Sequence, residues 1–432
     1  MAEQMKSSGI DWIGDIPTSW KCSKVKFYFS LVNGSTPESS DYDCWDGDIK
    51  WITPADMSDT GTISQGERFI TKYGYNSCGT TLLPVGSIVI SSRAPIGKIN
   101  ITTAELCTNQ GCKSLIRNAD NRYFYYLFLA GQNELSLLGR GTTFLELSTY
   151  DLNEFGIVIP AEDEQKAIAD FLDKECAQID SINADLEKQI ALLQKYKKSL
   201  ITETVTKGLD KSVPMKDSRV EWTSKIPCHW EVKRFKYLCE YITDGSHFSP
   251  ETTDEGYPYI TAADVKGVGL DYDAAKKISQ QDFISLQKAG CQPRKGDVLL
   301  VKDGATTGRI GMVTSEKPCV VLSSVAILRA PDNMDARYLR YLMESDFVQA
   351  QIQASMAGSA MPRTVLSKII NYWGITCSKE EQKEICDFFD RKCGYIETVI
   401  ETKQVQQSTI QQHKKSLIYE YVTGKKRVKE VR

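Results

Sequence analysis

The sequence lacks most of the features that mark exported, membrane-spanning or metal-holding proteins. No apolar run approaches the roughly 18 residues that cross a bilayer, and the opening MAEQMKSSGIDW has no apolar stretch of the signal-peptide kind. The 13 cysteines form no CxxC pair, and only three histidines, His229, His247 and His413, could assist them. We therefore expect a cytoplasmic protein with reduced, mostly buried thiols, no metal site and no membrane contact.

Recognisable catalytic motifs are missing as well. Glu-Gln-Lys occurs at residues 164–166 and 381–383 and resembles the end of a magnesium-dependent nuclease motif, but both copies open predicted helices, where acids suit the helix dipole. GATTGRIG at 304–311 fits neither common glycine-rich phosphate motif and indicates a turn between strands. The chain also has no nucleophile motif and no Asn-Pro-Pro-aromatic tetrapeptide of amino-methyltransferases. The sequence thus predicts no catalytic residue and favours a binding protein.

What the sequence does contain is an internal duplication. The spacing between matched segments drifts from 210 residues (Trp12 to Trp222) to 217 (Glu164 to Glu381), while the order of the segments is kept. The matched pairs are IDWIGDIPTSW (10–20) and VEWTSKIPCHW (220–230), WITPAD (51–56) and YITAAD (259–264), LPVGSIVISSRAPIGKI (83–99) and QPRKGDVLLVKDGATTGRI (292–310), EQKAIADFLDKECAQID (164–180) and EQKEICDFFDRKCGYIE (381–397), and YKKSLITETVT (196–206) and HKKSLIYEYVT (413–423). Chance similarity does not keep five segments collinear, so the chain consists of two homologous halves.

Each half changes character along its length. The first part is rich in β-branched and aromatic residues broken by turn formers, and GSIVISS and GDVLLVK are typical of buried strands. The second part is free of Pro and Gly from 162 to 207, which indicates a long helix. At 432 residues the chain exceeds one hydrophobic core. We predict an α+β fold with domains at 1–160 and 220–377, long helices at 161–207 and 378–424, a polar linker at 208–219 and a basic tail at 425–432.

The two long helices carry seven-residue apolar series of the coiled-coil type. Neither helix can bury such a stripe alone, so we predict that they pack on each other, antiparallel because each follows its own domain. Ser378 and Glu381 form a capping-box pattern at the start of the second helix. The predicted seam residues are Ile168, Leu172, Ile179, Ile182, Leu186, Leu193, Tyr196 and Leu200 on the first helix and Ile385, Phe389, Ile396, Val399, Ile410 and Leu417 on the second.

Two related domains on paired helices suit a partner with two sites at a fixed spacing, and double-stranded DNA is such a partner. The net charge of −3 argues against a globally basic surface but leaves local basic patches open. Loop side chains able to contact base edges or phosphates are the candidate contacts. They are Ser91, Ser92, Arg93, Lys98, Asn109, Gln110, Lys113, Arg140, Thr142 and Thr143 in the first half, and Lys302, Asp303, Thr306, Arg309, Ser323, Ser324, Arg363 and Thr364 in the second.

These features together resemble the specificity (S) subunit of type I restriction–modification systems. The resemblance rests on SGIDWIGDIPTSW, SSRAPIGK, TNQGCKSL and PAEDEQKAIADFLD in the first half. The second half departs from it at VEWTSKIPCHW, where glycine is replaced, and has no Asn-Gln-Gly. Because recognition domains of this family vary with the target they read, the departures concern local detail.

The resemblance implies a role for each part. Each domain would be a target recognition domain that reads one half of a split DNA sequence, and the antiparallel helices would fix the gap between the halves. Two methyltransferase (M) subunits would supply S-adenosylmethionine and adenine-N6 methylation, and restriction (R) subunits would supply ATP-driven translocation and magnesium-dependent cleavage. The chain itself would hold no cofactor, and the target adenine would be flipped into the M subunit.

Two other functions stay open at this stage. A self-contained nuclease or methyltransferase would show activity as the purified chain with magnesium, or with S-adenosylmethionine and DNA. A coiled-coil adaptor without a DNA role would fail to protect a bipartite site together with an M subunit.

Overall fold

The structure is a computed structural model, and it describes residues 4–93, 95–140, 145–356 and 362–428. The chain divides into two compact units, which we call unit 1 (Met1–Leu186 with Val405–Arg432) and unit 2 (Glu187–Gln404). Each unit holds one globular domain, one end of helix α5 (Glu162–Lys207) and one end of helix α11 (Lys379–Val422). The predicted long helices are therefore present, with ends within two residues of those expected.

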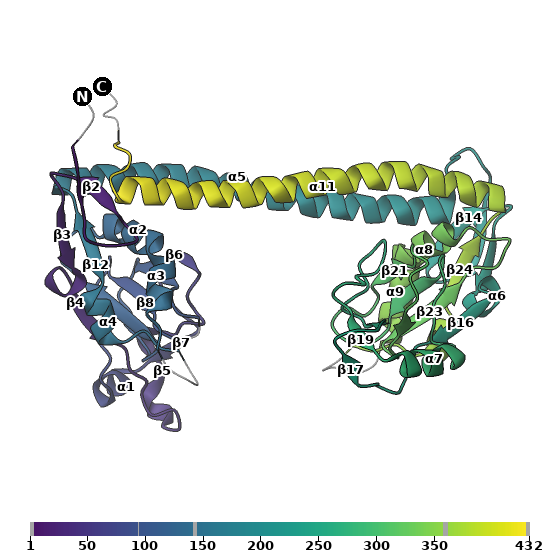
Figure 1. Cartoon of the computed structure of the whole chain (residues 1–432), viewed down its shortest axis with the longest axis horizontal. Coiled ribbons are helices and arrows are strands. Elements are labelled where there is room, and N and C mark those ends of the chain that lie inside the picture. The colour runs from purple at the N-terminus through teal and green to yellow at the C-terminus, as the bar shows by residue number, and fades with distance from the viewer. Residues whose placement is uncertain (1–3, 94, 141–144, 357–361, 429–432) are drawn as a thin grey trace. The chain divides into compact units, whose positions relative to one another are not determined.

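Unit 1 is built around a five-stranded sheet (Figure 1). Its strands, in spatial order, are β4 (Ser30–Asn33), β11 (Cys112–Ile116), β8 (Ile88–Ser91), β9 (Ile99–Thr102) and β6 (Thr60–Ile63). The remaining strands pair as β10 (Cys107–Thr108), β5 (Trp45–Ile52) and β7 (Arg68–Ile70), as β12 (Gly156–Ile159) with β3 (Lys21–Lys24), and as β1 (Met5–Ser7) with β2 (Asp15–Pro17). The short helices are α1 (Lys72–Ser77), α2 (Arg122–Ala130), α3 (Gln132–Leu137) and α4 (Thr149–Glu154), with 3-10 turns at Val25–Phe27 and Tyr42–Cys44.

Unit 2 repeats this plan with one strand fewer in the central sheet and one strand more in the second sheet. Its central sheet runs β16 (Tyr241–Asp244), β23 (Val325–Arg329), β20 (Val298–Val301) and β21 (Ile310–Met312). A second sheet holds β17 (Thr252–Thr253), β19 (Lys276–Ile278), β18 (Tyr257–Ile260) and β22 (Val320–Val321), and two pairs join β15 (Glu231–Arg234) to β24 (Trp373–Thr376) and β13 (Met215–Val220) to β14 (Thr223–Pro227). The short helices are α6 (Phe235–Leu238), α7 (Gln280–Lys288), α8 (Ala336–Glu344), α9 (Asp346–Ser355) and α10 (Leu366–Ile369).

The predicted buried strands are confirmed, since every residue of β8 and of β20 is buried. Each strand runs into an antiparallel neighbour through a turn with a glycine at positive φ, Gly97 at 95° and Gly308 at 94°. In both turns a glutamine side chain donates to the glycine carbonyl, Gln132 at 2.7 Å and Gln349 at 2.9 Å. GATTGRIG is therefore the turn that the sequence predicted.

The predicted linker at 208–219 is wrong over its second half. Met215 to Val220 forms β13, which pairs with β14 in an antiparallel register that shifts between Asp217 and Val220. The polar sequence MKDSRV concealed this strand because its side chains are mostly exposed and show no apolar alternation. The equivalent pair in unit 1 is β1 with β2, so the duplication includes this short hairpin.

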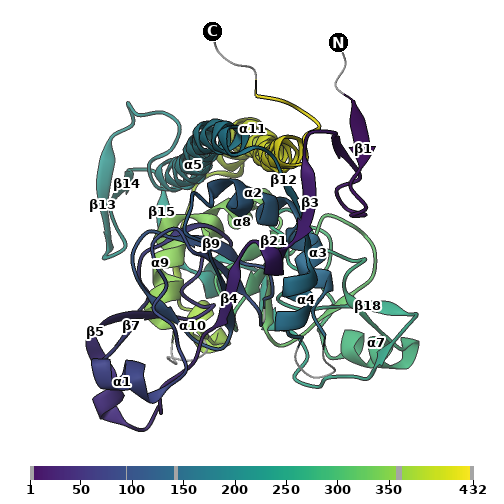
Figure 2. The ribbon, with the colours of Figure 1, turned by 90° about the vertical axis from the view of Figure 1, so that its left-hand side faces the viewer.

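The ends of α5 and α11 lie side by side and run antiparallel in both units. In unit 1 the Phe171 and Tyr421 rings lie 4.4 Å apart, and further along α5 the Asp180 carboxylate accepts from Lys414 at 2.6 Å. Residue numbers thus rise along one helix as they fall along the other, and the two helices are seen together over α2 (Figure 1, Figure 2). The antiparallel packing that the sequence predicted is confirmed.

One of the two predicted seam positions is displaced by one residue. Leu172, Ile179 and Leu186 are buried as predicted, but Ile182 and Tyr196 are 50% and 58% exposed. The second seam position lies four residues after the leucine series that begins at Leu172, instead of three residues after it. Its residues are Cys176, Asn183, Ile190 and Lys197. Because two of these side chains are polar, the sequence shows no apolar series there. The other predicted seam residues are buried (Ile168, Ile385, Phe389, Ile396) or partly buried (Leu193, Leu200, Val399, Ile410, Leu417).

A tryptophan joins each domain to the start of its long helix. Trp20 is fully buried and its indole N–H donates to the Glu164 carboxylate at 3.1 Å. Trp230 is equally buried and donates to Glu381 at 3.0 Å. The repeated Glu-Gln-Lys segment therefore supplies acceptors for these indoles, which accounts for its glutamates without a catalytic role.

An arginine clamp makes a second joint in each unit. The Arg122 guanidinium contacts Asp120 at 2.6 Å and reaches Asp170 and Asp173 on α5 at 2.8 and 2.6 Å. The hydrogen bonds to these carboxylates, that to Asp120 first, raise the pKa of Arg122. Tyr126 donates its hydroxyl to Asp173 at 2.7 Å.

The clamp of unit 2 repeats that of unit 1 residue by residue. Arg337 contacts Asp335 at 2.7 Å, Asp387 at 3.0 Å and Asp390 at 2.6 Å, and Tyr341 donates to Asp390 at 2.7 Å. We call the tryptophan joint and the arginine clamp together the frame of each unit. Within the described residues, no helix is both long and apolar enough to cross a membrane.

Candidate nucleic-acid interface

Two chain segments meet beside the end of the central strand in each unit. The hairpin loop follows β8 or β20 (residues 92–98 in unit 1, of which 94 is not described, and 302–309 in unit 2), and the pre-helix segment leads into α4 or α10 (145–148 and 362–365). In unit 1 the Leu147 N–H donates to the Ser92 carbonyl at 2.9 Å, and in unit 2 the Thr364 N–H donates to the Lys302 carbonyl at 2.9 Å. The main chain thus joins the same two segments in both units.

In unit 1 the two segments are linked by an ion pair. The Arg93 guanidinium lies 3.0 Å from the Glu146 carboxylate, and the side chains are 48% and 39% exposed. Nearby, Arg140 lies 2.9 Å from Asp151 and is 76% exposed, while Asp151 is 8% exposed. Asp151 also accepts from the Ser148 hydroxyl at 2.6 Å, so its carboxylate is fixed beside the long and exposed Arg140 side chain.

Unit 2 has an ion pair between the same two segments. The Arg363 Nε lies 3.1 Å from the Asp303 carboxylate, and the side chains are 57% and 27% exposed. Both guanidinium groups are therefore partly exposed to solvent while each lies within ion-pair distance of a carboxylate.

A buried lysine lies near the interface in each unit. Lys113 donates to the Asn33 amide oxygen at 3.0 Å and to the Thr149 hydroxyl at 3.1 Å, and burial lowers its pKa. Lys302 is 1% exposed and its ammonium lies 3.4 Å from Asp244 and 3.6 Å from Asp303. Both lysines are buried, Lys113 in strand β11 and Lys302 directly after β20, so neither presents its ammonium group at the surface.

The candidate contacts predicted from sequence differ in how far they are exposed. Arg93, Gln110, Arg140 and Arg363 are exposed, and Asn109, Asp303, Thr306, Arg309, Ser323 and Ser324 are partly exposed. Ser91, Ser92, Lys113, Lys302 and Thr364 are buried, so they were misplaced as surface contacts, and Lys98 binds the Pro54 and Met57 carbonyls. Thr142 and Thr143 lie outside the described residues.

Sequence reasoning named Asp303 but missed three other carboxylates of the candidate interface. Glu146 and Asp151 hold arginines, and Asp244 lies beside a buried lysine. These three acids are revealed only by their pairing in space with an arginine or a lysine.

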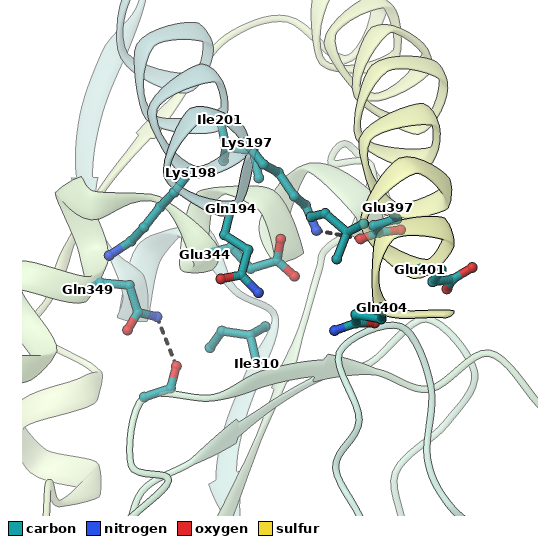
Figure 3. Close-up of a pocket in the computed structure, with 12 residues that line it drawn as sticks. Gln194, Lys197, Lys198, Ile201, Ile310, Glu344, Gln349, Glu397, Glu401 and Gln404 are labelled. Carbon is teal, nitrogen blue, oxygen red and sulfur yellow. Dashed lines mark hydrogen bonds and ion pairs between the residues drawn. The ribbon is translucent and has the colours of Figure 1, made fainter. Parts of the chain in front are cut away.

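A cavity in unit 2 lies on the helix side of the hairpin loop and touches that loop at Gly308. It measures about 540 Å³ and lies between α5, α11 and the β20–β21 turn. Figure 3 shows Lys197 directed at Glu397 across it and Gln349 at the turn. The second lysine, Lys198, pairs with Asp346 at 2.6 Å, and burial raises the pKa of Glu344. Both lysines are thus paired with carboxylates, and the cavity has no uncommitted cation for a phosphate.

Comparison with known proteins identifies the family. The family described as "Type I restriction modification DNA specificity domain" matches residues 17–192 and 227–407, so the chain belongs to this family and contains its domain twice. It is 27% identical over 97% of its length to the type I restriction enzyme MjaIX specificity subunit of Methanocaldococcus jannaschii, 96% of which is covered. It is 26% identical over 65% of its length to the EcoBI specificity subunit of Escherichia coli, 60% of which is covered.

A solved structure supports the fold. A chain from a study titled "Structural basis underlying complex assembly and conformational transition of the type I R-M system" aligns with a TM-score of 0.70 at 13% identity, covering 94% of this chain and 98% of that one. The predicted family, the fold class and the subunit type are therefore confirmed: the chain is a specificity subunit of type I restriction–modification. Subunits of this kind are the non-catalytic, DNA-recognising members of such systems, which act with methyltransferase and restriction subunits.

Proposed function

We propose that this subunit reads a two-part sequence in duplex DNA, one half-site with the globular domain of each unit. The observation that carries the proposal is the contrast within the duplication. The frame contacts are made by the same residue types in both units. The hairpin loop and the pre-helix segment, in contrast, carry different side chains in the two units. A protein that reads two different half-sites needs this combination of a repeated scaffold and diverged loops.

The partners follow from the proposed role. Two M subunits would bring S-adenosylmethionine and transfer its methyl group to adenine N6, and R subunits would bring ATP and magnesium for translocation and cleavage. Among the described residues, no group of three or more His, Cys, Asp and Glu side chains is placed to hold a metal ion. We expect the complex to act in the cytoplasm, where it meets DNA.

The two long helices would set the number of unread base pairs between the half-sites. Inserting one seven-residue repeat after Leu186 and another after Gln404, where the two units divide, lengthens both helices together. Seven helical residues add about 10 Å, or about three base pairs of DNA. We expect the variant with its M partner to select both original half-sites with a longer spacer, measured on a library of bipartite DNA with randomised spacer length.

The outcomes of this experiment separate the candidate functions. Retention of the original spacing would contradict the ruler function of the helices. Cleavage or methylation by the purified chain alone, with magnesium or S-adenosylmethionine, would instead favour a self-contained enzyme. Absence of sequence-specific protection by the complex would favour an adaptor without a DNA role.

A further inference from the structure

The ion pair at the interface has opposite polarity in the two units. Two backbone hydrogen bonds define the equivalence: Ser92 and Lys302 accept from the pre-helix segment at 2.9 Å, and their own N–H groups donate to Gly111 and Ser324 at 2.8 Å. The residue after Ser92 is Arg93, and the residue after Lys302 is Asp303.

The partners on the pre-helix segment are reversed accordingly. Each lies one residue before the backbone donor of that segment, and it is Glu146 in unit 1 and Arg363 in unit 2. Isolated antiparallel bridges pair Arg93 with Glu146 and Asp303 with Arg363, which confirms the equivalence. The hairpin loop therefore supplies the arginine in unit 1 and the carboxylate in unit 2.

Stability does not account for an ion pair of reversed polarity at this place. All four side chains are at least 27% exposed, and ion pairs at exposed sites contribute little to folding. The clamp arginines, by contrast, lie on equivalent helices, Arg122 on α2 and Arg337 on α8, and contact aspartates at matching positions. A pair that keeps its location and exchanges its charges is better explained by what each unit binds.

The geometry of each guanidinium suits a base edge. Arg363 presents its Nε to Asp303, and Arg93 presents one Nη to Glu146. An arginine has five N–H donors in a rigid fork, so two donors stay available in either case. A pair of parallel N–H donors matches the O6 and N7 acceptors of guanine in the major groove, the commonest specific contact between protein and DNA. The carboxylate reduces the side-chain freedom that binding would otherwise remove.

We propose that Arg93 and Arg363 each read a guanine, one in each half-site, and that Glu146 and Asp303 are positioning residues that hold the two guanidinium groups. The inference rests on the proposed function, since it names the base chemistry of the same interface. Because the arginine comes from a different segment in each unit, the two guanines lie at different places relative to the frame.

The decisive experiment exchanges the pair within unit 1. The double variant Arg93→Glu with Glu146→Arg keeps one arginine and one carboxylate at the interface but gives unit 1 the polarity of unit 2. The complex with its M partner is tested on a library with both half-sites randomised. We expect the base preference to change about tenfold or more at one or two positions of the first half-site, with the second half-site, the spacer length and the urea midpoint unchanged.

Single variants of unit 2 test the guanine assignment. Arg363→Gln and Arg363→Lys should each lower the preference for guanine at one position of the second half-site about ten- to hundredfold, because neither side chain offers the arginine fork. Arg391→Gln on the exposed side of α11 removes the same charge away from the interface and serves as the control. It should leave the preference at every position unchanged.

Two results would overturn the inference. Unchanged half-site preferences in the exchanged variant would make the pair structural, and a uniform loss of affinity for all sequences with a weaker salt dependence would make the arginines phosphate contacts. A wild-type complex that selects no bipartite site would instead overturn the proposed function, and the inference with it.

Discussion

The two units hold the same residues where each domain meets its long helix and different residues where the domain ends in loops. Trp20 and Trp230 bind glutamates at matching helix positions, and Arg122 and Arg337 bind matching aspartates. At the candidate interface, by contrast, the arginine and the carboxylate of the ion pair exchange segments between the two units. The difference is what we expect if the repeated contacts serve the subunit's own architecture and the diverged contacts serve a ligand, since only the second kind is free to diverge between halves.

Removing the tryptophan joint should have the largest effect. Trp20→Ala removes a fully buried indole and leaves the Glu164 carboxylate without that donor, so we expect a loss of about 3–5 kcal/mol in the unfolding free energy of unit 1. Trp230→Ala should cost unit 2 a similar amount. Urea unfolding followed by hydrogen exchange in each unit measures both, and Phe27→Ala, at a 72% exposed site, is the control. Clearly unequal losses would show that the two joints are not equivalent.

The corrected helix seam predicts an effect of intermediate size. Ile190→Ala should destabilise unit 2 by about 2–3 kcal/mol because Ile190 is 9% exposed between the helices. Ile182→Ala on the same helix should change stability by no more than about 0.5 kcal/mol, since Ile182 is 50% exposed. The two unfolding free energies are compared directly. A larger loss from Ile182→Ala would restore the seam that was first predicted from the sequence.

The arginine clamps should contribute least to stability. Arg122→Ala breaks contacts with three carboxylates, but solvent screens them, because Arg122 is 33% exposed and Asp170 53%. We expect a loss of about 1–2 kcal/mol at low salt that shrinks as salt is added. Arg337→Ala should behave alike in unit 2, and Arg122→Lys should recover only part of the loss. Losses that do not depend on salt would mean that packing, rather than charge, holds the clamp.

Much of the architecture was predictable because the duplication supplies two versions of every element. Gly97 and Gly308 marked the same turn, and the leucine series of α5 marked the first seam position. The second seam position escaped prediction because Asn183 and Lys197 occupy it and bond across the helix pair, to Gln407 and Glu397. Periodicity records apolar side chains only, so a seam that uses polar pairs is invisible to it.

The exposure of the candidate contact residues was predicted correctly for some side chains and wrongly for others. Arg93 and Arg363 are exposed as expected, but Lys113 and Lys302 are buried beside polar partners. A lysine in a loop-like sequence is ordinarily solvent-exposed, and nothing local signals that it turns inward. Glu146 was missed because its role depends on an arginine 53 residues away (93 to 146) that only the fold brings near.

The antiparallel helix pair also has a consequence for folding during synthesis. Unit 2 is one continuous stretch, Glu187–Gln404, whereas the core of unit 1 includes Ile418 and Val422 from the end of the chain. The Tyr123 hydroxyl donates to the Val422 carbonyl at 3.0 Å, a contact that closes a loop of 299 residues. Because domains fold as their residues emerge, we expect unit 2 to complete its core first, and unit 1 to complete its core only when the last turns of α11 have been synthesised.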